Sequence, residues 1–219
     1  MSGSSYIQIL DLAAGAVLVC AILTLWRSDL RAIISILSIQ GVALGVVAGV
    51  LAAHIHDGAL AITAAIVFIV KGSVIPMLIR QVVRRDPGSR EASPLINVPA
   101  SLVGAAVLVV IAYLASGKIT ALFPNPASRL VPIGIATVLV GFLLLVTRRK
   151  TVSQIVGLLM IDNGVALVAF LLTAGVPLVV ELGASLDVLL VVAVLRVLAT
   201  AMRAQSGALD LDQMQELHD

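Results

Sequence analysis

The chain has 219 residues, of which 60% are hydrophobic and only 12% are charged, and its formal net charge is +2. Soluble domains carry about 25% charged residues, so this composition excludes an ordinary soluble enzyme and indicates an integral membrane protein. Cys20 stands alone and cannot form a disulfide within the chain or supply the several thiolates of an iron–sulfur cluster. No nucleic-acid partner is expected.

Seven apolar runs have the length that a membrane-spanning helix needs, about 20 residues. They predict an all-α protein that crosses the lipid bilayer seven times. The expected spans are Tyr6–Trp26, Ala32–Ala53, Ala59–Ile79, Val98–Ser116, Leu130–Val146, Val152–Thr173 and Val179–Met202.

Basic residues in the connecting segments fall mainly on one side of the membrane when seven spans are counted. That side receives Arg27, Arg31, Arg80, Arg84, Arg85, Arg90, Arg148, Arg149, Lys150 and Arg203. The opposite side receives only Lys118 and Arg129. By the positive-inside rule, we expect an extracytoplasmic N-terminus and a cytoplasmic C-terminus in the plasma or inner membrane.

Two segments of the chain match at an offset of 123 residues. Ile39-Gln-Gly-Val-Ala-Leu44 resembles Asp162-Asn-Gly-Val-Ala-Leu167, and the same offset places Arg80 on Arg203. This pattern predicts a parallel repeat of a three-helix unit, in which spans one to three match spans five to seven and span four links them. The expected division is a first unit (1–80), a cytoplasmic loop with the linking helix (81–129), a second unit (130–203) and a cytoplasmic tail (204–219). The acidic tail is expected to be solvated, with docking onto a cytoplasmic partner as the alternative.

Within the expected spans, four charged residues are candidates for a function: Lys71, Asp162, Glu181 and Asp187. Each costs roughly 2.5–3.5 kcal/mol on insertion scales, so a chain that keeps four of them is expected to use them. Asp162 and Asp187 each lie about ten residues into their span, which at ~1.5 Å per residue places both near the midplane. Desolvation and mutual repulsion suit such acids to proton uptake and release, and we expect all four residues to form a proton relay. Structural ion pairs with Lys71 or Arg196 are the alternative.

Three further polar side chains, two amides and an arginine, are expected to interact with these charged residues. Asn163 follows Asp162, and Gln40 occupies the matching position of the first unit. Arg196 is a further polar residue of the last span, close enough to its cytoplasmic end to extend toward the interface. No nucleophile–base pair, phosphate-binding loop or metal-ligand cluster is evident, and no metal site is expected.

Glycine and proline predict local packing. Gly41, Gly45 and Gly49 recur every four residues and form a stripe typical of closely packed membrane helices. Pro76 is expected to kink the third span and free a backbone carbonyl beside Lys71, either for packing or for water entry.

Several motifs along the chain resemble those of one known family. They are Gln154-Ile-Val-Gly before Asp162-Asn-Gly, Glu181-Leu-Gly and Asp187 in the next span, Gly207-Ala-Leu-Asp-Leu in the tail, and Lys71 followed by Pro76 in span three. Together they resemble hydrogenase-4 component E over essentially the whole chain. Asp162 stands where a glutamate is expected to be common in that family, which keeps the carboxylate but shortens its reach.

The resemblance implies an accessory, non-catalytic membrane subunit of a group 4 hydrogenase or formate hydrogenlyase complex. The C-terminal half is similar to the small K-type membrane protein of respiratory complex I and to its counterpart in multisubunit cation/proton antiporters, where acids in consecutive helices belong to the proton path. The implied partners are antiporter-like membrane subunits and a peripheral hydrogenase module, which would hold the nickel–iron and iron–sulfur centres. No cofactor is expected in this chain. The alternatives are a scaffold subunit that moves nothing and a small stand-alone transporter.

Overall fold

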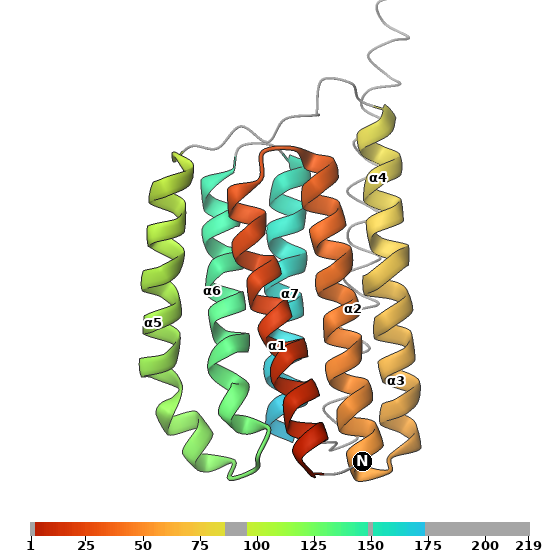
Figure 1. Cartoon of the computed structure of the whole chain (residues 1–219). Coiled ribbons are helices and arrows are strands. Elements are labelled where there is room, and N and C mark those ends of the chain that lie inside the picture. Colours follow the sequence, from red (N-terminus) through yellow and green to blue (C-terminus); the bar gives the residue numbers. More distant parts are fainter. Residues whose placement is uncertain (1–2, 86–95, 149–150, 174–219) are drawn as a thin grey trace, which may run out of the picture. The chain divides into compact units, whose positions relative to one another are not determined.

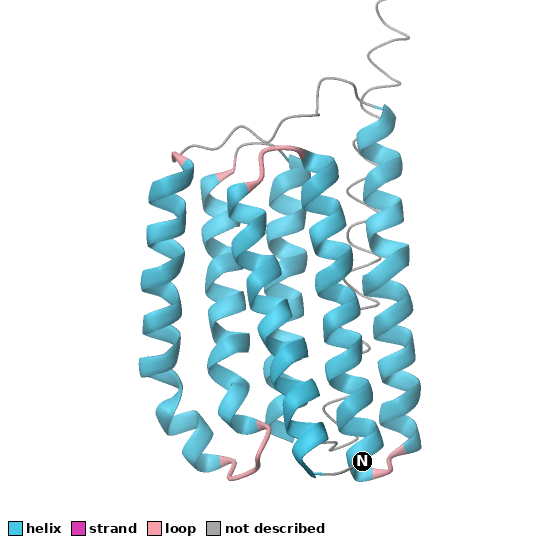
Figure 2. Ribbon diagram, viewed as in Figure 1, coloured by secondary structure: helices cyan, strands magenta, loops and turns pink. Residues whose placement is uncertain are grey.

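The computed structural model describes residues 3–85, 96–148 and 151–173. This part of the chain is helical, with short turns and no strand (Figures 1 and 2). Its elements are α1 (Gly3–Trp26), α2 (Leu30–Ile55), α3 (Gly58–Ile69), the π-helix η1 (Val70–Val74), α4 (Ile75–Arg85), α5 (Val98–Leu122), the 3₁₀ turn η3 (Ser128–Leu130), α6 (Val131–Thr147) and α7 (Thr151–Thr173).

Six helical segments within the described residues are long and apolar enough to cross a membrane. They are Ser5–Trp26, Leu30–Ile55, Gly58–Gln81, Val98–Leu122, Ser128–Thr147 and Val152–Thr173. The prediction of an all-helical, multi-pass membrane protein is confirmed at this level. The expected seventh span, Val179–Met202, lies outside the described residues, and so does the tail.

Helix α5 is longer than the sequence predicted, because polar residues alone do not end a helix. It continues past Ser116 to Leu122, and the Thr120 hydroxyl donates to the Ser116 carbonyl at 3.2 Å on the way. It stops where Pro124 follows: Phe123, the residue before the proline, leaves the α region with φ −125° and ψ 76°.

Polar caps set where the other helices begin. Asp29 accepts from the backbone N–H groups of Arg31 and Ala32 at the start of α2. At the start of α3, Asp57 accepts from the backbone N–H groups of Ala59 and Leu60, and the Ala59 nitrogen lies 2.9 Å from Asp57 Oδ1. These acids satisfy donors that a helix N-terminus leaves unpaired. Both carboxylates therefore have a structural role as N-caps in the short turns.

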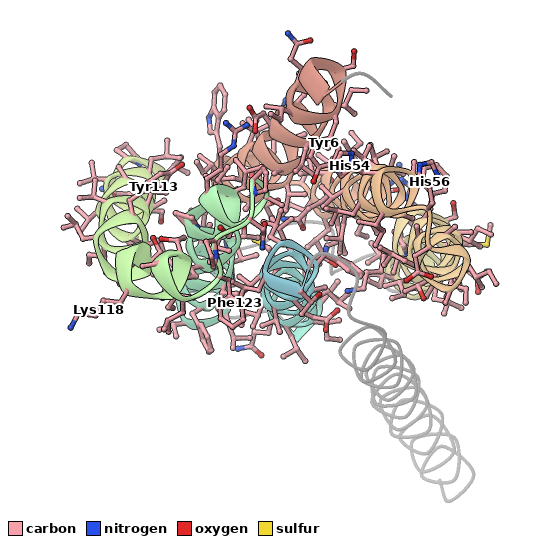
Figure 3. All side chains as sticks on the ribbon, turned by 90° about the horizontal axis from the view of Figure 1, so that it is seen from below. Tyr6, His54, His56, Tyr113, Lys118 and Phe123 are labelled. Carbon is pink, nitrogen blue, oxygen red and sulfur yellow. The ribbon has the colours of Figure 1, made fainter. Side chains whose placement is uncertain are left out.

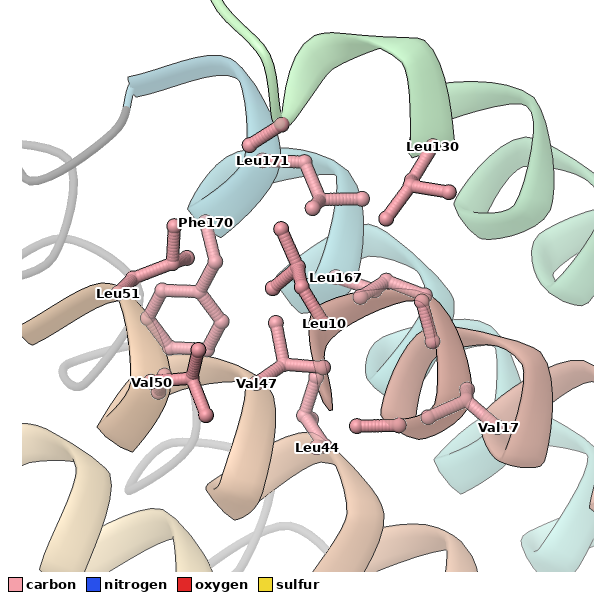
Figure 4. Close-up of a cluster of buried hydrophobic side chains, with 14 of the residues drawn as sticks. Leu10, Val17, Leu44, Val47, Val50, Leu51, Leu130, Leu167, Phe170 and Leu171 are labelled. Atoms are coloured by element: carbon pink, nitrogen blue, oxygen red, sulfur yellow. The ribbon is translucent and has the colours of Figure 1, made fainter. Parts of the chain in front are cut away.

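Helices α1, α2, α6 and α7 run side by side, α5 packs beside α6, and α3, η1 and α4 continue as one rod against α2 (Figure 1). One apolar cluster joins α1, α2 and α7 (Figure 4). The members labelled in Figure 4 are Leu10, Val17, Leu44, Val47, Val50, Leu51, Leu130, Leu167, Phe170 and Leu171. This cluster holds α7 against α2, which fixes the neighbourhood of the polar residues in their middle turns.

Basic residues lie at both ends of the described bundle. Arg31 lies in the first turn of α2 and Arg80 in α4, whereas Lys118 lies near the end of α5, at the other end of the bundle. At this end the His54 ring stacks on Tyr6, with ring centroids 3.9 Å apart (Figure 3). His54 belongs to the last turn of α2, and His56 and Asp57 form the turn between α2 and α3.

Candidate functional site

A buried ion pair joins the middle of the third span to the middle of α7. The Nζ atom of Lys71 lies 2.6 Å from the Oδ2 atom of Asp162. The Lys71 side chain is 4% exposed and the Asp162 side chain 10% exposed. The structure thus brings together two charges that are 91 residues apart in the chain. Each charge offsets part of the cost of burying the other, so removing Lys71 would take this compensation from the Asp162 carboxylate at membrane depth.

Lys71 lies in a π-helical turn, and Pro76 accounts for one of its unusual bonds. In η1 the Ile75 N–H donates to the Val70 carbonyl, five residues back instead of four. Pro76 has no N–H, so the Gly72 carbonyl four residues earlier loses its helical donor. The Ser38 hydroxyl of α2 donates to this Gly72 carbonyl. The freed carbonyl that the sequence predicted is therefore Gly72, and α2 satisfies it.

Gly41 lets α2 approach the backbone of η1 beside Lys71. A Cβ atom at Gly41 would lie closer than 3.0 Å to the Lys71 carbonyl group and 2.8 Å from the Gly72 nitrogen. A Cβ at Gly45 would lie 2.8 Å from the Cα of Phe68, whereas one at Gly49 would meet nothing nearer than 3.9 Å. The glycine stripe is therefore tightest next to the ion pair.

A chain of amide hydrogen bonds crosses three helices beside the ion pair. Asn163 Nδ2 donates to Gln40 Oε1 at 3.1 Å, and Gln40 Nε2 donates to the Val17 carbonyl at 3.0 Å. Asn163 is 3% exposed and Gln40 1%. These bonds tie α7 to α2 and α2 to α1, and they satisfy polar groups that would be costly to bury unpaired.

The other expected relay residues cannot be placed against this pair. Glu181, Asp187 and Arg196 lie outside the described residues. Within the described ranges, no three His, Cys, Asp or Glu side chains gather closely enough to hold a metal ion.

Comparison with known proteins gives one full-length relationship. No family model matches the chain, and no solved structure matches it. The chain is 40% identical over 220 residues to "Uncharacterized protein Rv0085" of Mycobacterium tuberculosis (strain ATCC 25618 / H37Rv), with 100% of both chains covered. The chain belongs to the Rv0085 family. Coverage of both chains from end to end means that the relationship with Rv0085 extends over all the described helices.

Arg148 is a structural residue of this Rv0085 family protein that sequence reasoning missed. It was assigned to a solvated loop, yet it is 3% exposed. Its Nη2 atom donates to the Leu25 carbonyl at 2.9 Å and to the Arg27 carbonyl at 3.2 Å. The cation therefore caps the end of α1, where carbonyls lack helical partners and the helix dipole is negative. Burial lowers the pKa of the Arg148 guanidinium from its ordinary value.

A second ion pair lies at the surface of the Rv0085 family protein. Arg129 Nη2 lies 2.6 Å from Asp11 Oδ1 and 2.7 Å from Asp11 Oδ2. The side chains are 49% and 45% exposed. An exposed pair of this kind is worth at most about 1 kcal/mol and offers a matched control for the buried pair.

Proposed function

We propose that the protein is an accessory membrane subunit of a hydrogenase-like, complex I-related assembly, in which Lys71 and Asp162 belong to a proton-translocation path. The observation that carries the proposal is the buried Lys71–Asp162 contact of 2.6 Å at the middle of two membrane-spanning segments. The resemblance to hydrogenase-4 component E supplies the setting. In this proposal the redox centres reside in partner subunits.

The contact has the geometry of a direct proton transfer. A separation of 2.6 Å is that of a short, charge-assisted hydrogen bond. Movement of one proton from Nζ to Oδ2 converts an ammonium and a carboxylate into an amine and a carboxylic acid. When a second proton then binds at Nζ and the first leaves from Oδ2, the pair returns to an ammonium and a carboxylate, and one proton has crossed it.

The π-helical turn gives the pair a means of opening. Single π-turns within α-helices occur frequently at functional sites. Five-residue bonding in η1 can revert to four-residue bonding, which would shift Lys71 along and around the helix axis. In the described, closed state the Ser38 hydroxyl donates to the Gly72 carbonyl. An open state would let Lys71 pass its proton to a group other than Asp162.

We infer that the chain contains the parallel repeat, and the offset of 123 residues supports this in two ways. Gln40 and Asn163 are separated by 123 residues and hydrogen-bond to each other, as equivalent residues do beside a pseudo-twofold axis. Thr24 and Thr147 are also equivalent, and each hydroxyl donates to the carbonyl four residues earlier, at 2.8 and 2.6 Å.

The proposal extends to parts of the chain beyond the described residues. Val179–Met202 forms the seventh span and carries Glu181 and Asp187 as further relay groups. The N-terminus faces outward and the C-terminus the cytoplasm, in the plasma or inner membrane. The partners are antiporter-like membrane subunits and a peripheral hydrogenase module with the nickel–iron and iron–sulfur centres.

A scaffold role is the second candidate, because a closed and buried ion pair is also what a structural brace requires. Replacing a buried pair by apolar residues of similar volume is often neutral or stabilising. The double variant Lys71→Met/Asp162→Leu therefore separates the two functions. A scaffold tolerates it, whereas a relay loses both groups that exchange the proton.

The test measures proton uptake into membrane vesicles that contain the whole complex, driven by the redox reaction of its partner subunits. A pH-sensitive dye reports uptake, and native gel electrophoresis reports assembly. We expect Asp162→Asn and the double variant to assemble and to lose most of the uptake. Asp11→Asn, which removes a carboxylate from the exposed pair, is the matched control and should retain it. Unchanged uptake in an assembled double variant would refute the relay and leave the scaffold.

A further inference from the structure

Two adjoining cavities lie between α2 and the η1–α4 rod, at the end of the bundle that carries Arg31 and Arg80. One has a volume of about 380 Å³ and is lined by Arg31, Ile34, Ser35, Arg80 and Val83. The other has a volume of about 400 Å³ and is lined by Ser38, Gly72, Ser73, Pro76, Met77, Arg80 and Gln81. Because Arg80 lines both, we treat them as one groove, the α2–α4 groove.

The polar lining of the α2–α4 groove consists of cations and hydrogen-bond donors. Arg31 and Arg80 bring two guanidinium groups, and no carboxylate is among its described lining residues. Arg80 Nη2 donates to Ser35 Oγ at 3.1 Å, while the Ser35 hydroxyl donates to the Arg31 carbonyl at 2.9 Å. Both arginine side chains are exposed and can turn toward a ligand. Guanidinium and hydroxyl groups arranged in this way recognise phosphate oxygens.

The position of the groove favours the phosphate of a lipid headgroup over that of a soluble ligand. The arginines of the groove lie where one apolar segment, Leu30–Ile55, begins and another, Gly58–Gln81, ends. Lipid headgroups are expected at the ends of such membrane-length segments. Apolar side chains continue from it along the outer face of the rod: Met77 is 61% exposed and Val74 40%. A soluble phosphate ester has no apolar chain to pack against these exposed side chains, whereas a phospholipid has an acyl chain that can. Basic pockets between transmembrane helices are known binding sites for anionic headgroups.

We propose that the α2–α4 groove binds an anionic phospholipid, with its phosphate between Arg31 and Arg80 and an acyl chain along Val74 and Met77. Ser35 holds the Arg80 guanidinium over the groove. Gly72, which lines the inner part of the groove, is adjacent to Lys71, but lipid binding by the groove does not depend on proton translocation.

Binding is tested on the purified full-length chain in a neutral detergent. The chain is titrated with fluorescent phosphatidylglycerol, and the same titration with phosphatidylcholine gives the neutral reference. Near a membrane surface each arginine contributes about fivefold to the affinity for an anionic lipid, so Arg31→Gln/Arg80→Gln should weaken phosphatidylglycerol binding about 25-fold. Arg27→Gln removes an arginine outside the groove, at the same end of the bundle, and should change it little. Arg80→Lys keeps the charge and should retain most of the binding.

Several outcomes decide the proposal. Equal binding of phosphatidylcholine, or unchanged binding in the double variant, would overturn it. Competition by millimolar inorganic phosphate as effective as competition by unlabelled lipid would overturn the lipid assignment and leave a soluble anion site. Loss of a partner protein in the double variant with phosphatidylglycerol binding intact would make the groove a protein interface. If the double variant does not fold, Arg31→Gln alone is expected to weaken binding about fivefold.

Discussion

Gly41→Ala is predicted to destabilise the protein by displacing the backbone that carries Lys71. The added Cβ would lie closer than 3.0 Å to the Lys71 carbonyl group and 2.8 Å from the Gly72 nitrogen. Both neighbours are backbone atoms, so no side chain can rotate away. Either α2 or η1 must move, and the Ser38 bond to the Gly72 carbonyl and the ion pair lie directly beside this contact.

The magnitude follows from two opposing terms. Overpacking of a well-packed interior costs about 1–3 kcal/mol. Alanine in place of glycine within a helix returns about 0.5–1 kcal/mol. Gly49→Ala is the matched control in the same stripe, because its Cβ meets only the Ala64 Cβ at 3.9 Å. Gly49→Ala therefore has only the favourable term, and the two variants should differ in unfolding free energy by about 2 kcal/mol.

The assay is reversible unfolding in mixed micelles with increasing sodium dodecyl sulfate, followed by circular dichroism. The midpoint should fall for Gly41→Ala and stay or rise for Gly49→Ala. Introducing Lys71→Met into each background adds a second readout. If Gly41→Ala has already separated the pair, Lys71→Met costs less there than in the Gly49→Ala background. Equal midpoints for the two glycine variants would refute the close-approach argument.

Three further predictions concern buried polar groups and use the same unfolding assay. Lys71→Met alone should cost about 3–5 kcal/mol by leaving the Asp162 carboxylate unpaired, and adding Asp162→Leu should recover most of that loss. Asn163→Leu should cost about 1–3 kcal/mol because the Gln40 oxygen loses its donor, and a Gln40→Leu/Asn163→Leu double variant that is no more stable than the single one would contradict this account. Arg148→Gln should cost about 1.5–3 kcal/mol through its charged bonds to carbonyls at the end of α1, and amide exchange there should rise, since carbonyls without a cap promote fraying.

The spans could be predicted from sequence because the bilayer thickness sets how many consecutive apolar residues a membrane-spanning helix needs. The six described segments follow that rule, although α5 continues past the expected end at Ser116 to Leu122, and α4 continues past Ile79 to Arg85. Start signals were also available and unused. Asp29 and Asp57 are each followed within a residue or two by a long apolar run, which is the pattern of an N-cap.

The site could be predicted only in part, because pairing depends on helix packing. The sequence left open whether the buried acids act as a relay or pair with Lys71. The structure selects Asp162 as a partner of Lys71, since the α2–α7 and α2–η1 contacts bring the two together. The repeat matched Gln40 with Asn163 in the sequence, but a hydrogen bond between them required knowing that α2 and α7 are neighbours. Arg148 was missed for the same reason: its acceptors are more than 120 residues away.

The π-helical turn η1 makes the third span a helix with one residue inserted. An α-helix advances about 100° per residue, so an extra residue in a turn rotates everything after it by that angle relative to everything before it. A helical wheel drawn through the whole span therefore assigns α4 to the wrong faces relative to α3. The inserted residue is what directs Arg80 toward Ser35 while Phe68 packs against Gly45 of the same helix α2. Alignments of this family should accordingly tolerate or require a one-residue gap between Val70 and Val74. Deletion of one residue there would rotate α4, and with it the α4 side of the groove, away from α2.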